Sequence, residues 1–340
     1  MRQMPAVPAP IQQRVANMIG ALQPGAVDVE IADLNRLTGG NARHAWAFTA
    51  SWGEPKERQY KRCVMLCKAG AGQLEVDLGR EFRTLAALGR TSLPSPRVLW
   101  LDERGTYLGM PGFVMERGDG ESSILPLLDA TDRGTTRSLA GQLIRIGADL
   151  HRVDWRTAGL GFLVKDDAAL APIQELARWE AQYLQNRMEP LPVLASIFEW
   201  LRRRLPAPKR VALVHGDFRL GNFLYSGGKI ELLLDWEMAH LGDPLEDLTW
   251  IYRPLWSPKA FLPLDDAIAI YEVAANCKVR PTDLLYYRIF SEAKFAVISL
   301  TAARNYRDGR TEKLRLAGRM FTVPECLELC LQWMDQWEAT

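Results

Sequence analysis

Leu213-Val-His-Gly-Asp217-Phe-Arg-Leu-Gly-Asn222-Phe-Leu-Tyr225 is followed closely along the chain by Glu231-Leu-Leu-Leu-Asp235-Trp-Glu237. Both segments have the pattern of short apolar strands that end in loops, and the loops carry Asp217, Asn222 and Asp235. One carboxylate in such a set can accept the proton of a hydroxyl group. The other carboxylate and the amide oxygen suit Mg²⁺. The two segments therefore predict a site for phosphoryl transfer from Mg-ATP.

The spacing of this loop follows the His-x-Asp-x-x-x-x-Asn pattern of kinase catalytic loops, with glycine where protein kinases carry arginine. We expect Asp217 to be the catalytic base, and Asn222 and Asp235 to hold the metal ion. Arg219 is expected to neutralise charge on the transferred group, although a solvent-exposed arginine would explain the same residue. His215 is expected to fix the loop.

These residues resemble the aminoglycoside phosphotransferase family, which are small-molecule kinases with a protein-kinase-like fold. The longer string Leu234–Leu248 is most similar to bacterial relatives of the kinase-like domain attached to some acyl-CoA dehydrogenases. The resemblance covers the chain from about Leu37 to the C-terminal helices. It implies an ATP- and Mg²⁺-dependent enzyme in which Asp247 supports the catalytic loop by accepting hydrogen bonds from its backbone N–H groups.

The composition agrees with a two-lobed globular protein. A chain of 340 residues is long for one core, and its 48% hydrophobic and 24% charged residues are typical of globular domains. The net charge of +1 gives no broad basic face for nucleic acid. The five cysteines lack metal-ligand spacing, and no apolar run reaches the length of a membrane span. We therefore expect a cytoplasmic protein with no membrane partner; its oligomeric state stays open.

The periodicity predicts an α+β fold, with a small antiparallel sheet first and a mainly helical lobe after it. We expect an N-terminal nucleotide-binding lobe over 1–117 and a C-terminal catalytic and substrate-binding lobe over 118–340. The first lobe is predicted to hold a lead helix and five strands with one further helix, at 11–22, 27–37, 44–52, 62–68, 76–88, 98–101 and 113–116. Helices are predicted at 137–151, 173–186, 193–205, 265–276, 282–305 and 322–338 in the second lobe.

Candidate nucleotide-binding residues lie in the first lobe. Gly39, Gly40 and Asn41 join two predicted strands, where glycines let backbone N–H groups approach phosphates. Lys68 ends the third strand, and an ion pair with Glu81 would orient it onto the phosphates. The relatives carry Arg or Lys within Val-Leu-Arg-Arg-Pro-Pro, whereas this chain has Cys-Lys. If the cysteine is the aligned position, the cation is missing or comes from its neighbour.

Met115 and Glu116 belong to the segment expected to face adenine, where backbone groups would bind the base. The acceptor is harder to identify. The arginines of Arg304–Arg310 could meet an anionic substrate such as the phosphates of coenzyme A, and a solvated helix end explains them equally well. The acidic residues after position 282 show no cluster of the kind that an aminoglycoside would need.

Three functions follow from these observations. The first is an ATP-dependent kinase for a small-molecule hydroxyl, with a hydroxyacyl-CoA or related hydroxy acid derivative as the substrate class implied by the resemblance. The second is an O-phosphotransferase for an antibiotic, either an aminoglycoside or a macrolide. The third is a catalytically weak nucleotide-binding module, which the unusual Cys67-Lys68 segment would suit.

Overall fold

The computed structural model describes residues 10–37, 43–68, 77–124, 127, 133–165 and 167–339. The chain divides into two compact units, each described here by itself. Unit 1 consists of Met1–Gly70, Val76–Ala86 and Pro96–Arg117. Unit 2 consists of Ala71–Glu75, Ala87–Ser95 and Gly118–Thr340.

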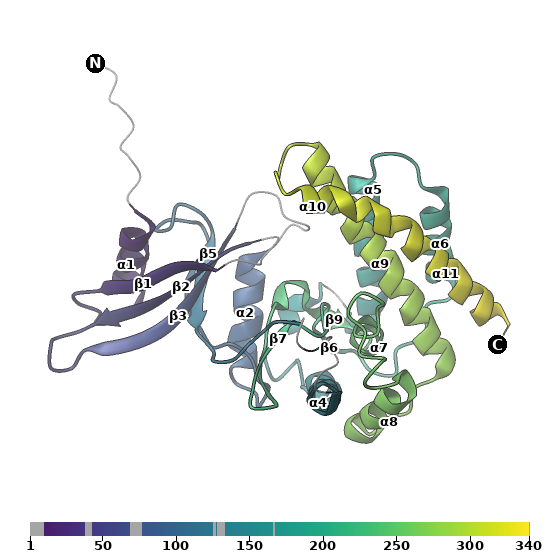
Figure 1. The fold of residues 1–340 in the computed structure, drawn as a ribbon, viewed down its shortest axis with the longest axis horizontal. Helices are drawn as coiled ribbons and strands as arrows, with labels where there is room; N and C mark the ends of the chain where they lie inside the picture. The colour runs from purple at the N-terminus through teal and green to yellow at the C-terminus, as the bar shows by residue number, and fades with distance from the viewer. Residues whose placement is uncertain are drawn as a thin grey trace, which may run out of the picture. The chain divides into compact units, whose positions relative to one another are not determined.

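Unit 1 is built on a five-stranded antiparallel sheet with the strand order β1-β2-β3-β5-β4 (Figure 1). Its strands are β1 (Glu30–Leu37), β2 (Arg43–Trp52), β3 (Gln59–Lys68), β4 (Val98–Asp102) and β5 (Gly112–Glu116). The helices α1 (Ile11–Leu22) and α2 (Leu78–Leu88) complete the unit, although the last two residues of α2 fall in unit 2.

The two helices cover opposite faces of this sheet. Met65 and Cys67 of β3 and Val114 of β5 point into a buried core that they share with α1. Phe113 is the neighbour of Val114 in β5 and therefore points to the other face. There its ring meets that of Phe82 in α2 edge-on, with 5.9 Å between the ring centroids.

Unit 2 is mainly helical and is organised around one long helix, α9 (Pro281–Arg307). Side chains around most of the circumference of α9 are buried, as expected for a helix enclosed by others. Helices that pack against it are α5 (Ala171–Asn186), α6 (Pro192–Arg203), α7 (Leu245–Trp250), α10 (Leu314–Ala317) and α11 (Thr322–Glu338). Unit 2 also contains α4 (Arg133–Arg152), α8 (Leu264–Ala275), and the 3₁₀ helices η2 (Gly161–Leu163), η3 (Ala168–Leu170) and η5 (Gly318–Phe321).

Two small antiparallel sheets interrupt these helices. One pairs β6 (Ala212–Val214) with β9 (His240–Gly242), and the other pairs β7 (Phe223–Ser226) with β8 (Lys229–Leu233). The 3₁₀ helix η4 (Trp236–Met238) follows β8. The loop between β6 and β7 and the turn after β8 carry the residues that the sequence singled out.

The predicted fold class is confirmed, with an antiparallel sheet first and a mostly helical remainder. The first strand differs from its predicted bounds, because it begins at Glu30 and not at Val27. Asp28 has a φ of 49°, which lies in the left-handed region, so the chain cannot be extended there.

Among the described residues, no helix combines the length and the apolar character needed to cross a membrane.

Candidate active site

The loop 215–222 begins where β6 ends, and it is hydrogen-bonded to α7. The backbone N–H groups of His215 and Gly216 donate to the carboxylate of Asp247 at 2.8 and 2.9 Å. Asp247 is fully buried, and Nε2 of His151 lies 3.1 Å from the same carboxylate. The expectation that Asp247 supports the loop through its backbone N–H groups is confirmed.

His215 fixes the loop as a neutral side chain. Its Nε2 lies 3.0 Å from the carbonyl oxygen of Leu234, and its Nδ1 accepts a hydrogen bond from the backbone N–H of Asp217 at 3.3 Å. The first contact needs a proton on Nε2 and the second needs a lone pair on Nδ1. Burial lowers the pKa of His215 despite the nearby carboxylates, in agreement with this tautomer. The imidazole therefore has a structural role.

Position 216 requires glycine. Its φ is 85°, and a Cβ atom there would lie 2.5 Å from the carbonyl oxygen of Met238. A larger residue would have to move backbone, which explains why arginine cannot occupy this position in the present loop.

The carboxylate of Asp217 is held by three neighbours, and its side chain keeps 16% exposure. Its Oδ1 accepts hydrogen bonds from the indole Nε1 of Trp250 at 2.7 Å and from Nε of Arg219 at 3.0 Å. Its Oδ2 accepts one from Nδ2 of Asn222 at 2.6 Å. The carboxylate is thus fixed in direction but still accessible to a substrate, as a positioned base requires.

Asn222 and Asp235 are brought together by the β7–β8 hairpin. The backbone N–H of Leu234 donates to the carbonyl oxygen of Asn222 at 2.8 Å, so the residue after Leu234 follows directly beside Asn222. The amide nitrogen of Asn222 donates to the carbonyl oxygen and the carboxylate of Asp217. Its Oδ1 accepts no hydrogen bond from any described residue and can face a cation. Asp235 itself adopts a left-handed conformation, with φ of 69°.

In unit 1, the predicted ion pair between Lys68 and Glu81 is wrong. Glu81 is buried and pairs with Arg43, whereas Lys68 is exposed and pairs with no carboxylate among the described residues. Alternation along β3 sends Cys67 into the core, where burial raises the pKa of its thiol to about 12. Because β2 and β3 pair Arg43 with Lys68, the arginine on the neighbouring strand reaches Glu81 instead.

The other candidates of unit 1 are only partly described. Met115 and Glu116 lie in β5, where both are half-buried and the Glu116 carboxylate pairs with Nζ of Lys61 at 2.6 Å. Gly39, Gly40 and Asn41 lie outside the described residues.

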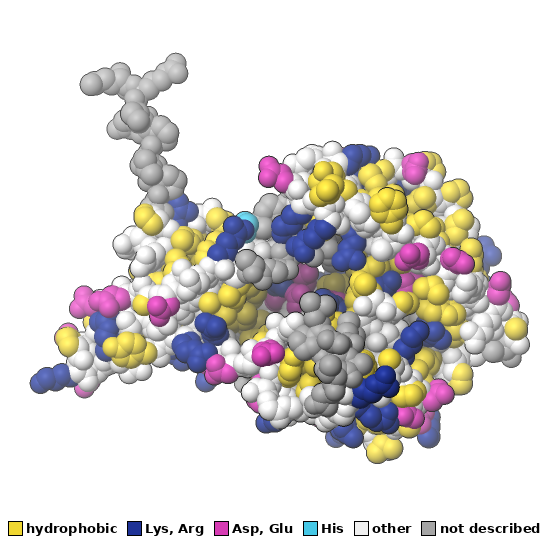
Figure 2. Space-filling model, in the orientation of Figure 1, with side chains coloured by type: hydrophobic (Ala, Val, Ile, Leu, Met, Phe, Trp, Pro, Cys, Tyr) yellow, Lys and Arg dark blue, Asp and Glu magenta, His cyan; other side chains and the backbone are white. Residues whose placement is uncertain are grey.

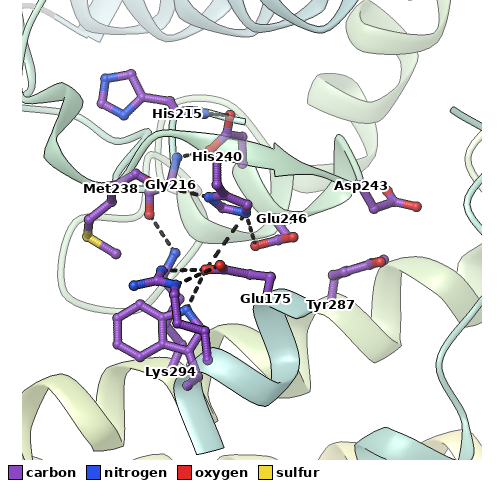
Figure 3. A network of polar contacts seen from close by, with 12 residues as sticks. Glu175, His215, Gly216, Met238, His240, Asp243, Glu246, Tyr287 and Lys294 are labelled. Carbon is purple, nitrogen blue, oxygen red and sulfur yellow. Dashed lines mark hydrogen bonds and ion pairs between the residues drawn. The ribbon is translucent and has the colours of Figure 1, made fainter. Parts of the chain in front are cut away.

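A buried charge network lies beneath the catalytic loop (Figure 3). Nζ of Lys294 in α9 donates to the carbonyl oxygen of Gly216 at 2.6 Å and lies 4.4 Å from the ring centroid of Trp250. Burial lowers the pKa of Lys294, while the charges of Glu246 and Glu175 oppose that shift. Lys294 thus contacts both the loop that carries Asp217 and the indole that binds its carboxylate.

The carboxylates of Glu175 and Glu246 and the ring of His240 lie close enough together to suit a metal ion. Cations from the chain already occupy this environment. Arg178 donates to Glu175 at 2.6 and 2.8 Å, and Lys294 acts on both carboxylates. Burial would lower the pKa of His240, but the two carboxylates raise it overall, and both ring nitrogens face oxygen atoms. We interpret the group as a buried ion-pair network.

The burial of the Asp243 carboxyl predicts that the free energy of unfolding depends on pH. Burial raises the pKa of its carboxyl to about 7, against an ordinary value of 3.8. A raised pKa means that the folded state binds the proton more tightly, so this stabilisation is complete below pH 3.8 and is lost as pH rises to 7. Asp243→Asn mimics the protonated form. Its free energy of unfolding, relative to wild type, should rise by about 2–3 kcal/mol between pH 5 and 8. Urea denaturation would measure this, and a difference independent of pH would contradict it.

Two of the three arginines that the sequence singled out for an anionic substrate share one carboxylate within the chain. Arg304 and Arg307 both donate to the carboxylate of Asp308, at 3.2 and 2.7 Å. This arrangement favours the alternative of a solvated helix end.

Sequence reasoning missed three residues: Trp250 and Lys294, which contact the Asp217 carboxylate or its loop, and Arg43 in unit 1. Trp250 and Lys294 had no motif to mark them, because a tryptophan and a lysine in apolar helices look like core and surface residues. Arg43 was hidden because its role depends on the pairing of β2 with β3. A signal existed only for Lys294, as the single cation of the mainly apolar stretch 293–303 in α9.

Comparisons with known proteins identify the family of the chain. The model of the phosphotransferase enzyme family (APH) matches residues 36–280. Mouse acyl-CoA dehydrogenase family member 10 is 32% identical over 187 residues, which is 54% of this chain and 17% of that protein. Rat acyl-CoA dehydrogenase family member 11 is 27% identical over 50% of this chain and 22% of that protein. The match thus spans about a fifth of the length of these relatives.

A solved structure supports the fold. It is that of a Ralstonia eutropha JMP134 protein named for the aminoglycoside phosphotransferases. The TM-score is 0.73 at 20% identity, over 95% of this chain and 98% of the other. Since the family model covers most of the chain, and the fold is that of small-molecule kinases, the chain belongs to the phosphotransferase enzyme family.

Proposed function

We propose that this protein transfers the γ-phosphoryl group of ATP to a hydroxyl of a small molecule, with Asp217 as the base. The observation that carries the proposal is the carboxylate of Asp217, fixed by Trp250, Arg219 and Asn222 and yet exposed to a ligand. Mg-ATP supplies the phosphoryl group and the charge neutralisation that Mg²⁺ brings when bound.

The steps that the chain itself performs follow from this geometry. Asp217 orients the acceptor hydroxyl and takes its proton as the oxygen bonds to phosphorus. The bond from the γ-phosphorus to the bridging oxygen breaks, and ADP leaves with the electron pair. Arg219 offsets negative charge on the transferred group, and Asn222 and Asp235 would hold Mg²⁺ through oxygen atoms.

We assign nucleotide binding to residues 1–117 and acceptor binding to residues 118–340. In the first part, Gly39, Gly40 and Asn41 are proposed to cover the phosphates, and Met115 and Glu116 to face the base. Arg43, oriented by Glu81, is proposed as the phosphate-binding cation in place of Lys68. An arginine that is 11% exposed and paired with a buried glutamate is held in one direction, as that role requires.

The proposed acceptor is a hydroxyacyl-CoA or a related hydroxy acid derivative. The similarity to acyl-CoA dehydrogenase family members supports this class, and the free cysteines agree with a reducing, cytoplasmic setting. An antibiotic acceptor is the alternative, because the fold is also that of aminoglycoside phosphotransferase APH(4)-Ia, solved with AMP-PNP and hygromycin B. That match has a TM-score of 0.57 at 15% identity, over 94% of this chain and 98% of the other.

ADP release with Mg-ATP tests the function across four acceptor classes: hydroxyacyl-CoAs, free hydroxy acids, aminoglycosides and macrolides. We expect a signal with the first or second class alone, absent from Asp217→Asn. A signal only with an antibiotic would replace the proposed acceptor. Tight ATP binding with silence across the panel would instead indicate a nucleotide-binding module with little catalytic activity.

A further inference from the structure

An aromatic cluster lies directly behind Asp217. It consists of Trp250, Trp256 and Phe295, whose ring centroids are 5.3 to 6.1 Å apart. Trp250 is the residue whose indole donates to the Asp217 carboxylate at 2.7 Å. Residues that pack against the cluster are therefore linked to the proposed base through Trp250.

Three arginine side chains lie against this aromatic cluster. The guanidinium carbon of Arg219 is 5.0 Å from the ring centroid of Trp256. That of Arg253 is 5.1 Å from the same centroid and 3.6 Å from the centroid of Phe295. That of Arg319, in η5, is 5.4 Å from the Phe295 centroid. Arg319 and Asp217 thus both contact the aromatic cluster, Arg319 at Phe295 and Asp217 at Trp250.

The three arginines differ in whether a carboxylate pairs with them. Arg219 contacts the Asp217 carboxylate, and Arg253 makes two hydrogen bonds to Glu292, at 2.8 and 2.6 Å. Arg319 has no ion pair with a carboxylate anywhere in the described part of the chain.

Arg319 is only half exposed, so its charge is partly removed from water. Burial lowers its pKa, and the charges of Arg253, Arg219 and Arg315 lower it further. A partly buried cation on which other cations act most strongly is costly unless an anion binds there. A second donor without a partner lies beside it, because Nη1 of Arg253 is buried and has no hydrogen-bond partner among the described residues. Figure 2 shows Lys and Arg side chains gathered on the face of unit 2 that carries α10, next to η5 in the chain.

We infer that Arg319, with Arg315 beside it, binds an anionic group of the acceptor, a carboxylate or a phosphate, near the Asp217 carboxylate. A guanidinium offers paired donors that match the geometry of such a group. Arg219 is already placed at Asp217 for the transferred phosphoryl group, so the anion at Arg319 comes from the acceptor. The same cations repel a polycationic aminoglycoside. This inference deepens the proposed function and relies on it for the identity of the acceptor.

The test is calorimetric binding to the full-length protein saturated with Mg-AMP-PNP, which fills the nucleotide site without transfer. The probes are coenzyme A, which offers phosphates, and 3-hydroxybutyrate, which offers a carboxylate. We expect Arg319→Gln to weaken the binding of at least one probe about tenfold or more, since a charge-assisted hydrogen bond is lost. The probe that weakens identifies the anion. Salt should weaken binding to the wild type more than to the variant.

Arg104→Gln is the matched control, because Arg104 is an exposed arginine of unit 1 that forms no ion pair within the described ranges. It should bind both probes like the wild type, and thermal unfolding should show both variants to be folded. Equal affinity of Arg319→Gln and wild type, or no binding of either probe to wild type, would overturn the inference. So would a loss of Mg-AMP-PNP affinity in Arg319→Gln, since the anion would then be a nucleotide phosphate.

Failure of the anion site and failure of the proposed reaction give different results. If the probes bind through Arg319 but no acceptor releases ADP, the site stands and the reaction is wrong. If ADP is released with equal kcat/KM by wild type and Arg319→Gln, the reaction stands and the anion site is wrong.

Discussion

Asp217→Asn should lower kcat by about 10³-fold, because the amide cannot take the proton of the acceptor hydroxyl. The substitution keeps the shape of the side chain and one oxygen that can accept from Trp250 or Asn222, so the loop should keep its structure. The KM for ATP and the free energy of unfolding should therefore change little. Steady-state ADP release and urea denaturation measure these quantities.

Asp149→Asn provides the matched control for this substitution. Asp149 lies in α4, where its side chain is 62% exposed, and we give it no role in the reaction. It should keep the kcat of the wild type. If Asp217→Asn kept kcat within about tenfold of wild type, general base catalysis by Asp217 would be wrong, since a positioned base contributes at least 10²-fold.

Lys294→Met should lower the free energy of unfolding by about 3–5 kcal/mol, because it removes one of the cations that balance the buried carboxylates of Glu175 and Glu246. Methionine has a similar length but no charge. Glu175 and Glu246 would lose a compensating ammonium, and the carbonyl oxygen of Gly216 would lose its donor. Since Gly216 precedes the base, kcat should also fall by more than the KM for ATP changes. Urea denaturation and steady-state kinetics measure the two effects.

Two further variants separate positioning by Lys294 from a general loss of packing. Lys278→Met removes an exposed lysine that pairs with Glu272, and it should cost less than about 1 kcal/mol. Lys294→Met combined with Glu246→Gln should be more stable than the sum of the two single changes predicts, because the second removes a charge that the first left unpaired. Lys294→Met with the stability and kcat of the wild type would show that the network does not support the loop.

The sequence was sufficient where short-range spacing determines structure. The loop from His215 to Asn222 could be predicted from the spacing of its motif, and the support by Asp247 from the resemblance to the kinase family. The longer helices of unit 2 could likewise be located from their periodicity, to within about four residues at each end, whereas the short helices α7 and α10 were not located. The start of β1 could not, because the left-handed conformation of Asp28 leaves little trace in the pattern.

Contacts between residues that are distant in sequence could not be predicted from the sequence. The pairing of Arg43 with Glu81 depends on which strand lies beside β3, and the sequence suggested the nearer lysine. The sequence suggested Arg304 and Arg307 as ligands of an anionic substrate, but both pair with Asp308 in the structure. The proposed role of Arg319 could not be predicted, because it depends on the contact with Phe295, which is far from it in the sequence.

The most direct test of the central claim follows the γ-phosphoryl group itself. ATP labelled with ¹⁸O in that group is incubated with Mg²⁺, the best acceptor of the panel, and either wild type or Asp217→Asn. The products are then analysed by mass spectrometry. The account predicts that wild type transfers the label to a phosphate ester of the acceptor, with one molecule of ester formed for each molecule of ADP. Asp217→Asn should form almost no labelled ester. Label recovered as inorganic phosphate with the acceptor unchanged, or equal ester formation by both proteins, would contradict it.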